Sequence, residues 1–334
     1  MRIAIDAMGG DKAPSEIIAG TLASLDSIGQ DQLVLVGNET IIREHLGDKQ
    51  SWQGKISIQH APEVVAMDDP PVEALRRKRK SSIAVMAKMA AAKEVDLVIS
   101  AGNTGACVAA CQLRMRSLPG VQRPGILVIL PTFAGPLAIC DVGANIAPKP
   151  MHLHQYALMA DIYVREVLGK KEPTVGLISI GQEDAKGNEL VKAVNQKLRD
   201  DDRVRFIGNV EPRDILNRPA DIVVCDGFVG NVILKLTEGL AAGLFKTILR
   251  EITRSKPEMV EHFTPVIEDL YSKHDYNEYG GAPLLGVDGT CVICHGSSDA
   301  RAIKSAILNA RHLVQSQINK KIFEQIQEVP LSEN

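Results

Sequence analysis

The stretch Asp96-Leu97-Val98-Ile99-Ser100-Ala101-Gly102-Asn103-Thr104-Gly105 joins a continuous apolar run to a turn of small polar residues, and an alanine-rich helical pattern follows. A short, uninterrupted apolar run is typical of a strand that is covered on both faces of a sheet. Nine further runs share this pattern, at residues 2–6, 32–36, 55–59, 125–130, 137–140, 174–180, 204–207, 221–225 and 290–294. Helical patterns separate many of them, at residues 38–47, 82–94, 104–117, 152–169, 187–199 and 211–217. This alternation predicts an α/β fold in which a doubly wound, mostly parallel sheet lies between two layers of helices.

Residues 231–273 interrupt the alternation with two successive helical patterns. The first carries Leu236, Leu240 and Leu244 at a spacing of four residues, and Ser255-Lys256-Pro257 ends it. This pattern predicts an αα-hairpin that projects from the sheet. Two interpretations remain open: the hairpin packs on its own core or on a second subunit, or its tip also contacts a membrane. We expect residues 1–330 to form a single domain that includes this hairpin, with one covering helix over residues 298–327.

The composition argues against several classes of protein. The chain has 334 residues, with 38 Lys and Arg against 41 Asp and Glu, and its net charge of −3 argues against a nucleic-acid-binding protein. No segment approaches the roughly 20 apolar residues that a membrane span needs, and the N-terminus lacks the apolar core of a secretory signal. We therefore expect a cytoplasmic protein whose membrane contact, where it occurs, is peripheral. The six cysteines are expected to stay reduced.

Glycines and small polar residues gather directly after five of the predicted strands, in turns at residues 7–11, 101–105, 141–145, 226–231 and 295–298. Ligands of doubly wound sheets bind at the carboxyl ends of the strands, so we expect these five turns to converge at one edge. Turn amides at a helix N-terminus suit oxyanions, and residues 100–105 and 295–298 are the best candidates to hold phosphate. Tight-turn geometry alone also explains each turn taken singly. The sequence has neither G-x-x-x-x-G-K-[ST] nor G-x-G-x-x-G, which argues against a P-loop ATPase and a dinucleotide-dependent dehydrogenase.

These turns and their neighbours resemble the PlsX phosphate acyltransferase family. The segment Asp6-Ala7-Met8-Gly9-Gly10-Asp11, followed by Ala13-Pro14, is similar to the opening motif of that family. Further similar segments lie at residues 76–82, 100–106, 141–145, 183–187, 224–231, 278–289 and 295–298. The resemblance implies a homodimeric enzyme that moves an acyl group from acyl carrier protein to inorganic phosphate. It also implies that the acyl phosphate feeds glycerol-3-phosphate acylation in phospholipid synthesis, with the membrane glycerol-3-phosphate acyltransferase as a partner. We expect no cofactor and no metal.

Phosphate needs no protein nucleophile to attack a thioester, because one of its own oxygens is the nucleophile. The candidates for phosphate binding are Gly9, Gly10, Gly102, Asn103, Thr104, Gly105, Lys235, Gly296, Ser297 and Ser298. Positive charge would come from Lys186 or Lys235, and Asn145 or Asn231 would donate to the thioester carbonyl. His295 is the candidate acid for the leaving thiolate. Asp6, Asp141 and Asp226 would orient donors or cap helices.

Several alternatives stay open at this point. An acyl-enzyme on Cys107 or Cys111 is the competing mechanism, although their i,i+4 spacing on an alanine-rich helix favours packing. The run Cys291-Val292-Ile293-Cys294-His295 matches the c-type haem motif, but the missing export signal argues against haem, and a lone C-x-x-C is poor for zinc. The rival functions are a phosphotransacetylase-like transfer from acyl-CoA and a non-catalytic scaffold that binds carrier protein.

The strongest basic run is Leu75-Arg76-Arg77-Lys78-Arg79-Lys80. A solvated helix face is its simplest interpretation. Acyl carrier proteins are strongly acidic, however, so Arg76, Arg77 and Arg79 are also a candidate docking surface. Arg114, Arg116 and Arg123 are expected to extend that surface.

Overall fold

The computed structural model describes residues 1–47, 52–273 and 280–327, and for residues 267–273 it describes the backbone only. Within these residues the strands form one sheet in the order β3-β2-β1-β4-β11-β10-β5-β6-β9-β7-β8. In chain order they are β1 (Arg2–Asp6), β2 (Gln32–Gly37), β3 (Ile56–His60), β4 (Leu97–Ser100), β5 (Gly125–Thr132), β6 (Gly135–Cys140), β7 (Thr174–Ile178), β8 (Arg205–Val210), β9 (Ile222–Val224), β10 (Ala282–Leu285) and β11 (Thr290–Ile293).

Strand direction divides this sheet into two parallel groups. Strands β3, β2, β1, β4 and β11 run parallel to one another, and so do β6, β9, β7 and β8. Between the groups, β11 with β10, β10 with β5, and β5 with β6 are antiparallel pairs. Three reversals make the second group run opposite to the first. The carboxyl ends of β1, β4 and β11 therefore lie at one edge of the sheet, where edge means the line formed by the strand ends. The carboxyl ends of β6 and β9 lie at the opposite edge.

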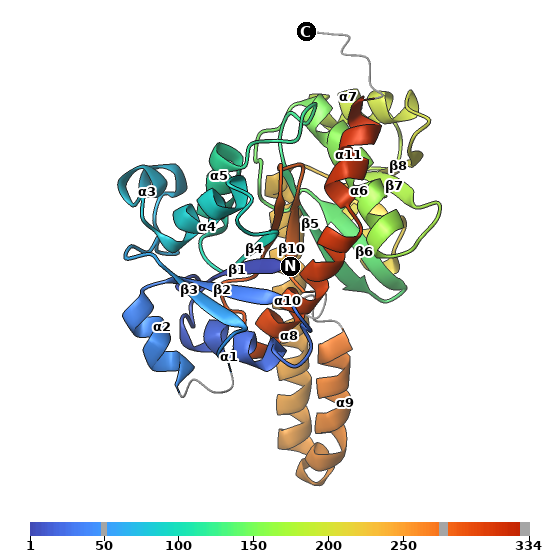
Figure 1. Cartoon of the computed structure of the whole chain (residues 1–334). Coiled ribbons are helices and arrows are strands. Elements are labelled where there is room, and N and C mark those ends of the chain that lie inside the picture. The colour runs from blue at the N-terminus through green and yellow to red at the C-terminus, as the bar shows by residue number, and fades with distance from the viewer. Residues whose placement is uncertain (48–51, 274–279, 328–334) are drawn as a thin grey trace.

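Helices cover both faces of the sheet (Figure 1). The helices are α1 (Ser15–Ser24), α2 (Glu39–Leu46), α3 (Pro71–Arg77), α4 (Ser82–Ala91), α5 (Thr104–Arg114), α6 (Pro150–Val167), α7 (Glu189–Arg199), α8 (Gly227–Ser255), α9 (Val260–Lys273), α10 (Ala300–Gln315) and α11 (Ile318–Gln327), with short 3-10 helices at Pro212–Asn217 and Pro257–Met259. Successive side chains of a strand point to opposite faces. Ile3 and Ile5 accordingly pack in a core with α1, α2, α6, α7, α10 and α11, whereas Ala4 packs with α4, α5 and the start of α8.

The predicted hairpin is confirmed, as α8 and α9 pack together and extend away from the sheet (Figure 1). The apolar stripe of α8 is nevertheless not covered by α9. Leu236 is 68% exposed and Leu240 is 62% exposed, and Leu244 is also exposed. Packing of this stripe within its own hairpin is therefore excluded in the single chain, which leaves a second subunit or a membrane. Among the described residues, no helix is both long and apolar enough to span a bilayer.

Two details of the fold differ from the sequence-based expectation. The strand β10 was not predicted, because Pro283 stands inside it and two glycines with positive φ, Gly280 and Gly281, come just before it. The single covering helix expected over residues 298–327 is two helices, α10 and α11. Gln317 separates them with a φ of 51°, a left-handed conformation that a continuous helix does not allow. Each predicted strand has its counterpart in the sheet, so the α/β architecture is confirmed.

Candidate functional site

The first group of turns follows β1, β4 and β11. Asp6, at the end of β1, is buried and accepts a hydrogen bond from Ser100 Oγ at 2.8 Å. Ser100 Oγ in turn accepts one from the Gly102 amide at 3.1 Å. Burial raises the pKa of the Asp6 carboxyl, and hydrogen bonds from Ser82 and Ser100 oppose that rise. Asp6 thus fixes the turn after β4 in relation to the end of β1, in keeping with the orienting role predicted for it.

Two glycines allow the turns of this group to approach one another. A Cβ on Gly9 would lie 2.5 Å from Asp6 Oδ2 and 2.7 Å from the Gly102 amide nitrogen, so no larger residue fits there. Gly10 has a φ of 116°, in the region that favours glycine. The next residue, Asp11, donates its amide to the Gly296 carbonyl at 2.8 Å, which ties the turn after β1 to the turn after β11.

The turn after β11 presents hydroxyl groups at the start of α10. His295 Nδ1 lies 2.7 Å from Ser297 Oγ, and both side chains are reached by solvent. Ser298 is only 4% exposed, and its Oγ has no hydrogen-bond partner in the part of the chain that the structure describes. A buried hydroxyl without a partner costs about 1–3 kcal/mol, so an oxygen ligand at this turn would stabilise it.

Asn103 has a structural role in this group. Its Oδ1 caps α5 by accepting the Ala106 amide at 3.0 Å. Its Nδ2 donates to the carbonyls of Ala66, Met67 and Asp69 at 3.0–3.1 Å. These bonds use both Nδ2 hydrogens, which favours structure over phosphate binding for Asn103. The neighbouring Thr104 is exposed at the first position of α5 and remains a candidate for phosphate.

The basic run lies next to the first group. Asp69, whose carbonyl accepts from Asn103, also forms an ion pair with Lys78. Arg76, Arg77 and Arg79 are exposed beside this ion pair. The expected extension by Arg114, Arg116 and Arg123 stays a prediction. Arg114 and Arg116 lie at or just beyond the C-terminal end of α5, about 16 Å along the helix from Thr104. Arg123 lies near His152, whose pKa is lowered by burial and by the Arg123 charge.

The second group of turns follows β6 and β9 at the opposite edge. The Asp141 carboxylate accepts amide hydrogens from Ile126, Gly143, Ala144 and Asn145 at 2.7–3.1 Å. Burial raises the pKa of Asp141, and these amide bonds oppose the rise. The Asp141 side chain therefore orders its own turn.

The start of α8 packs directly against this turn. Asp226 caps α8 by accepting the amides of Phe228 and Val229, the capping role that the sequence suggested. A Cβ on Gly230 would come within 2.0 Å of the Asp141 carbonyl, so only glycine permits this contact. Asn145 Nδ2 donates to Pro124 O and Tyr156 Oη, each at 2.7 Å. These bonds favour structure for Asn145, and Asn231, on the first turns of α8, remains the other candidate for the thioester carbonyl.

An apolar cavity of about 580 Å³ lies beside the second group. The ends of β7 and β9 line it together with the first residues of α7 and α8, among them Ser179, Gly187 and Asp226. Ser179 is buried, and its Oγ finds no hydrogen-bond partner within the described residues. Lys186, in the loop that leads to α7, and Lys235, on α8, are exposed on this side of the molecule.

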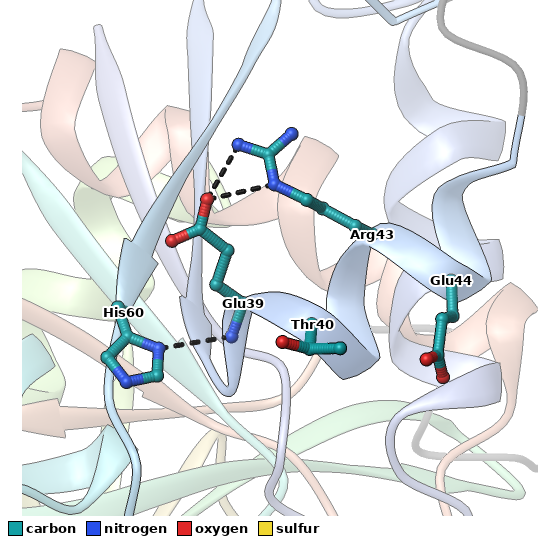
Figure 2. Close-up of a pocket in the computed structure, with 5 residues that line it drawn as sticks. All are labelled: Glu39, Thr40, Arg43, Glu44 and His60. Atoms are coloured by element: carbon teal, nitrogen blue, oxygen red, sulfur yellow. Dashed lines mark hydrogen bonds and ion pairs between the residues drawn. The ribbon is translucent and has the colours of Figure 1, made fainter.

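Another hollow, of about 610 Å³, lies at β3, the outer strand of the sheet (Figure 2). It is open and polar, lined by Glu39, Thr40, Arg43, Glu44 and His60. Arg43 pairs with Glu39 at 2.6 Å, and His60 Nδ1 accepts the Glu39 amide at 3.2 Å. None of these residues belongs to either group of turns, so this hollow is not the candidate site.

The expectation that five turns converge at one edge is wrong. The apolar runs predicted where the strands lie in the sequence but not their directions. The antiparallel pairs that involve β10, β5 and β6 separate the two groups of turns. Three strand spacings of about 4.8 Å and a strand length of about 13 Å put the groups on the order of 20 Å apart. Lys186, Lys235, Asn145 and Asn231 thus lie with the second group, away from Thr104 and Ser297.

All six cysteines are free and buried, which also bears on the alternatives. Burial raises the pKa of the Cys140, Cys225 and Cys294 thiols, which disfavours the thiolate that a nucleophile needs. The candidate nucleophiles Cys107 and Cys111 are fully buried, out of reach of a bulky thioester. Cys291 and Cys294 belong to the cores on opposite faces of the sheet, so they are unsuited to hold one haem. A covalent cysteine mechanism is therefore disfavoured.

Solved structures of low sequence identity share this fold. A phosphotransacetylase from Streptococcus pyogenes is 14% identical with a TM-score of 0.62, and the match covers 94% of each chain. A branched-chain phosphotransacylase from Enterococcus faecalis is 15% identical with a TM-score of 0.58, covering 94% of this chain and 99% of that one. The fold is therefore of the α/β class that phosphotransacylases also adopt.

Sequence relatives identify the family. The family model described as "Fatty acid synthesis protein" matches residues 1–321. A phosphate acyltransferase from Brevibacillus brevis is 44% identical over the full length of both chains. A second, from Bacillus licheniformis, is 43% identical and covers 98% of this chain and 99% of its own. The chain belongs to this fatty acid synthesis family, the PlsX family that its motifs resemble, and it is an enzyme of the acyltransferase class.

Proposed function

We propose that this protein transfers a fatty acyl group from acyl carrier protein to inorganic phosphate, and that the acyl phosphate product feeds glycerol-3-phosphate acylation in phospholipid synthesis. Membership of the PlsX family supports the proposal, as does the name phosphate acyltransferase that the relatives carry. The rival with acyl-CoA as donor has the fold of the phosphotransacetylases in its favour, but a fold alone does not fix a substrate.

One observation above the others supports phosphate binding at the first group of turns. Ser298 Oγ is buried and unpartnered at the start of α10, within the described part of the chain. The exposed Thr104 hydroxyl stands at the start of α5, where a helix N-terminus attracts anions, and the exposed Ser297 hydroxyl lies two residues before the Asp299 cap of α10. Phosphate oxygens would accept hydrogen bonds from these hydroxyls and from the turn amides.

The reaction is a direct displacement. A phosphate oxygen forms a bond to the thioester carbon while the carbon–sulfur bond breaks, and the sulfur leaves with its electron pair. A pantetheine thiol has a pKa of roughly 8.5, so its thiolate leaves readily and finally takes up a proton. His295, half-buried beside Ser297, is the group we assign to deliver that proton.

The acyl chain is assigned to the apolar cavity beside the second group. Its volume of about 580 Å³ and its lining by leucine, isoleucine and valine side chains suit a hydrocarbon chain. Because this cavity and the phosphate turns lie at opposite edges of one chain, we propose that they meet across a homodimer. The exposed stripe of α8 is the proposed dimer contact, and the hairpin tip around Phe263, which is 39% exposed, is the proposed peripheral membrane contact.

Docking of the acidic carrier protein is assigned to the basic run. Arg76, Arg77 and Arg79 are exposed, and the Lys78–Asp69 ion pair holds the segment next to the Asn103 cap of α5. A docked carrier would place its pantetheine close to the phosphate turns. Electrostatic attraction of this kind raises the association rate and weakens with salt.

The test supplies the purified protein with labelled phosphate and either acyl carrier protein or coenzyme A as the acyl donor. We expect label in acyl phosphate with the carrier-linked donor and much less with acyl-CoA. Ser298→Ala should raise KM for phosphate several-fold, and in the absence of phosphate it should raise the free energy of unfolding by about 1–3 kcal/mol, since it removes an unpartnered buried hydroxyl. Ser24→Ala, which removes a buried hydroxyl bonded to Thr21 O far from the site, is the control and should keep the KM. No labelled product from either donor would reject the proposal and leave the scaffold interpretation.

A further inference from the structure

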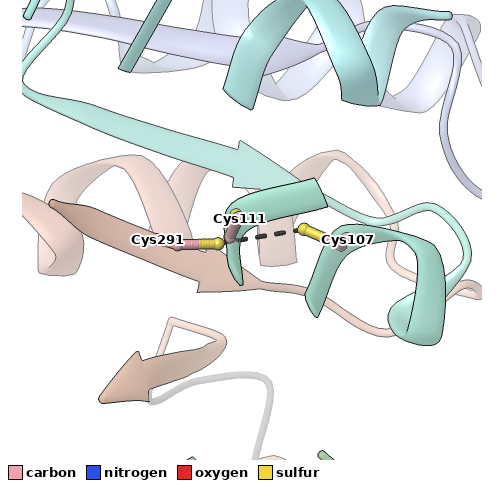
Figure 3. Close-up of side chains that lie close together, drawn as sticks. All are labelled: Cys107, Cys111 and Cys291. Carbon is pink, nitrogen blue, oxygen red and sulfur yellow. Dashed lines mark hydrogen bonds between the residues drawn. The ribbon is translucent and has the colours of Figure 1, made fainter. Parts of the chain in front are cut away.

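Three buried cysteines from distant parts of the sequence meet between α5 and β11. Cys107 and Cys111 lie one helical turn apart on α5, and Cys291 lies on β11. Their sulfur atoms are within 4.8 Å of one another, and the three residues are at most 1% exposed. Figure 3 shows the Cys107 and Cys291 side chains turned toward each other, with 3.8 Å between the two sulfurs.

This spacing suits a metal ion. Two sulfurs that each bind a zinc-sized ion at about 2.3 Å in a tetrahedral arrangement are about 3.8 Å apart. The i,i+4 spacing places Cys107 and Cys111 on one face of α5, and that face packs on β11. The fold thus brings three ligand sulfurs within 4.8 Å of one another, and Cys107 and Cys291 already lie at the tetrahedral spacing.

We propose that Cys107, Cys111 and Cys291 form a structural site for a soft divalent metal ion such as Zn²⁺. Thiolates select soft ions over hard ones such as Mg²⁺. Charge favours a divalent ion over Cu⁺, because three thiolates leave a net charge of −1 with Zn²⁺ and −2 with Cu⁺, and buried charge is costly. Ser100 lies next to Cys107, and its Oγ, whose hydrogen is donated to Asp6, keeps a lone pair for the fourth position that zinc ordinarily fills.

Binding is a ligand exchange without a change of oxidation state. Each metal–sulfur bond forms as the S–H bond of that cysteine breaks, and the protons pass to solvent. The occupied site would fasten α5 to β11 directly beneath the turn where Ser100 holds Asp6. Since the sulfurs are buried, loading requires local opening of α5 and should be slow.

The experiment uses the full chain, kept reduced with a phosphine and incubated with Zn²⁺, Cd²⁺, Cu⁺ or Mg²⁺ before native mass spectrometry. We expect one Zn²⁺ or Cd²⁺ per chain, seen as the mass of the ion less that of the displaced protons, and no specific Mg²⁺ adduct. The Tm should rise by about 3–5 °C at a free ion concentration near 100 times Kd. Cys111→Ala and Cys291→Ala should each lose the ion and the rise in Tm.

Cys294→Ala is the matched control, because Cys294 is buried on the opposite face beside the same strand. It should bind one ion as the unchanged protein does. Should Cys291→Ala fail to fold, Cys111→Ala decides, since alanine suits the alanine-rich helix α5. The proposal is overturned by the lack of a bound ion after prolonged incubation, by a preference for Cu⁺, or by binding that survives in Cys111→Ala or disappears in Cys294→Ala.

Discussion

Gly9 is the residue on which the geometry of the first group depends. A methyl group there would meet Asp6 Oδ2 and the Gly102 amide at less than 3.0 Å, and both belong to rigid turns. We expect Gly9→Ala to lower the free energy of unfolding by about 1–3 kcal/mol, as overpacking does, and to reduce kcat/KM at least tenfold because the turns move apart. Urea unfolding and steady-state assays measure the two effects.

The control for Gly9→Ala is Gly243→Ala. Gly243 lies on an exposed face of α8, and nothing lies within 4 Å of the position its Cβ would take. This change should stabilise the helix by up to about 1 kcal/mol, so it shows the effect of an added methyl group where there is space for it. Full activity and stability in Gly9→Ala would show that the three turns are not closely coupled.

At the residue scale, the sequence located the important turns but not the task of each side chain. Gly9 and Gly10 could be singled out because glycine next to a strand end signals a close approach of backbones. Asn103 and Asn145 were both predicted to contact substrate. Their partners, such as Ala66 for Asn103 and Pro124 for Asn145, are more than 20 residues away, so only the fold reveals that their amide groups are engaged.

Helix α6 carries a buried ionic contact that makes stability depend on pH. His154 Nε2 lies 2.6 Å from Asp201 Oδ2, and Arg203 also bonds to this carboxylate. Burial opposes ionisation of Asp201, yet the bonds from Arg203 and His154 hold its pKa at about 2. Burial lowers the pKa of His154, in agreement with an Nδ1 that is buried and unpartnered among the described residues.

Both shifts make the folded protein bind fewer protons than the unfolded chain. Stability should therefore fall as the pH drops below about 6.5, where unfolded histidine protonates, and again between about pH 4 and 2, where Asp201 protonates. After allowance for solvent screening, Asp201 should contribute about 1–2 kcal/mol to the second step. Asp201→Asn should lack that contribution. Urea unfolding over this pH range should therefore show a smaller loss of stability in the variant than in the unchanged protein. Parallel profiles would contradict the assignment.

The α8 stripe is tested by two substitutions at its exposed centre. Leu236→Gln combined with Leu240→Gln places polar groups where we propose that a second chain packs, and glutamine is also a good helix former. We expect sedimentation to show a shift from dimer to monomer with unchanged helical content. Thr253→Gln, at an exposed position near the end of α8, should leave the dimer intact. If the double variant remains a dimer, the stripe contacts a surface other than a second chain, such as a membrane.

At the element scale, apolar runs predict strands well because burial on both faces demands them, and the hairpin followed from its four-residue spacing. The direction of each strand could not be predicted in the same way. An apolar run reads alike in either direction, and β10 was hidden by Pro283 and the glycines before it. The two parallel groups of strands are separated by β10 and β5. Because β10 was not predicted, we expected all five turns at one edge of the sheet, whereas the molecule has turns at both edges.

The separation of the two groups sets a condition on the whole molecule. If Lys186, near the second group, and Ser297, in the first, serve the same reaction, they must come from two different chains, because about 20 Å divides the groups within one chain. Lys186→Ala and Ser297→Ala should each be inactive as homodimers. In a mixed dimer, one of the two sites would receive both unchanged residues, since a two-fold axis pairs the first group of each chain with the second group of the other.

Random mixing of the two inactive variants should therefore restore about a quarter of the activity, as half of the dimers are mixed and each has one intact site. Co-expression with two different affinity tags allows the mixed dimer to be purified, and its activity should then reach about half. Mixing Lys186→Ala with the same change on a differently tagged chain is the control and should restore nothing. A pure mixed dimer without activity would contradict a site shared between two chains, because complementation requires that Lys186 and Ser297 come from different chains.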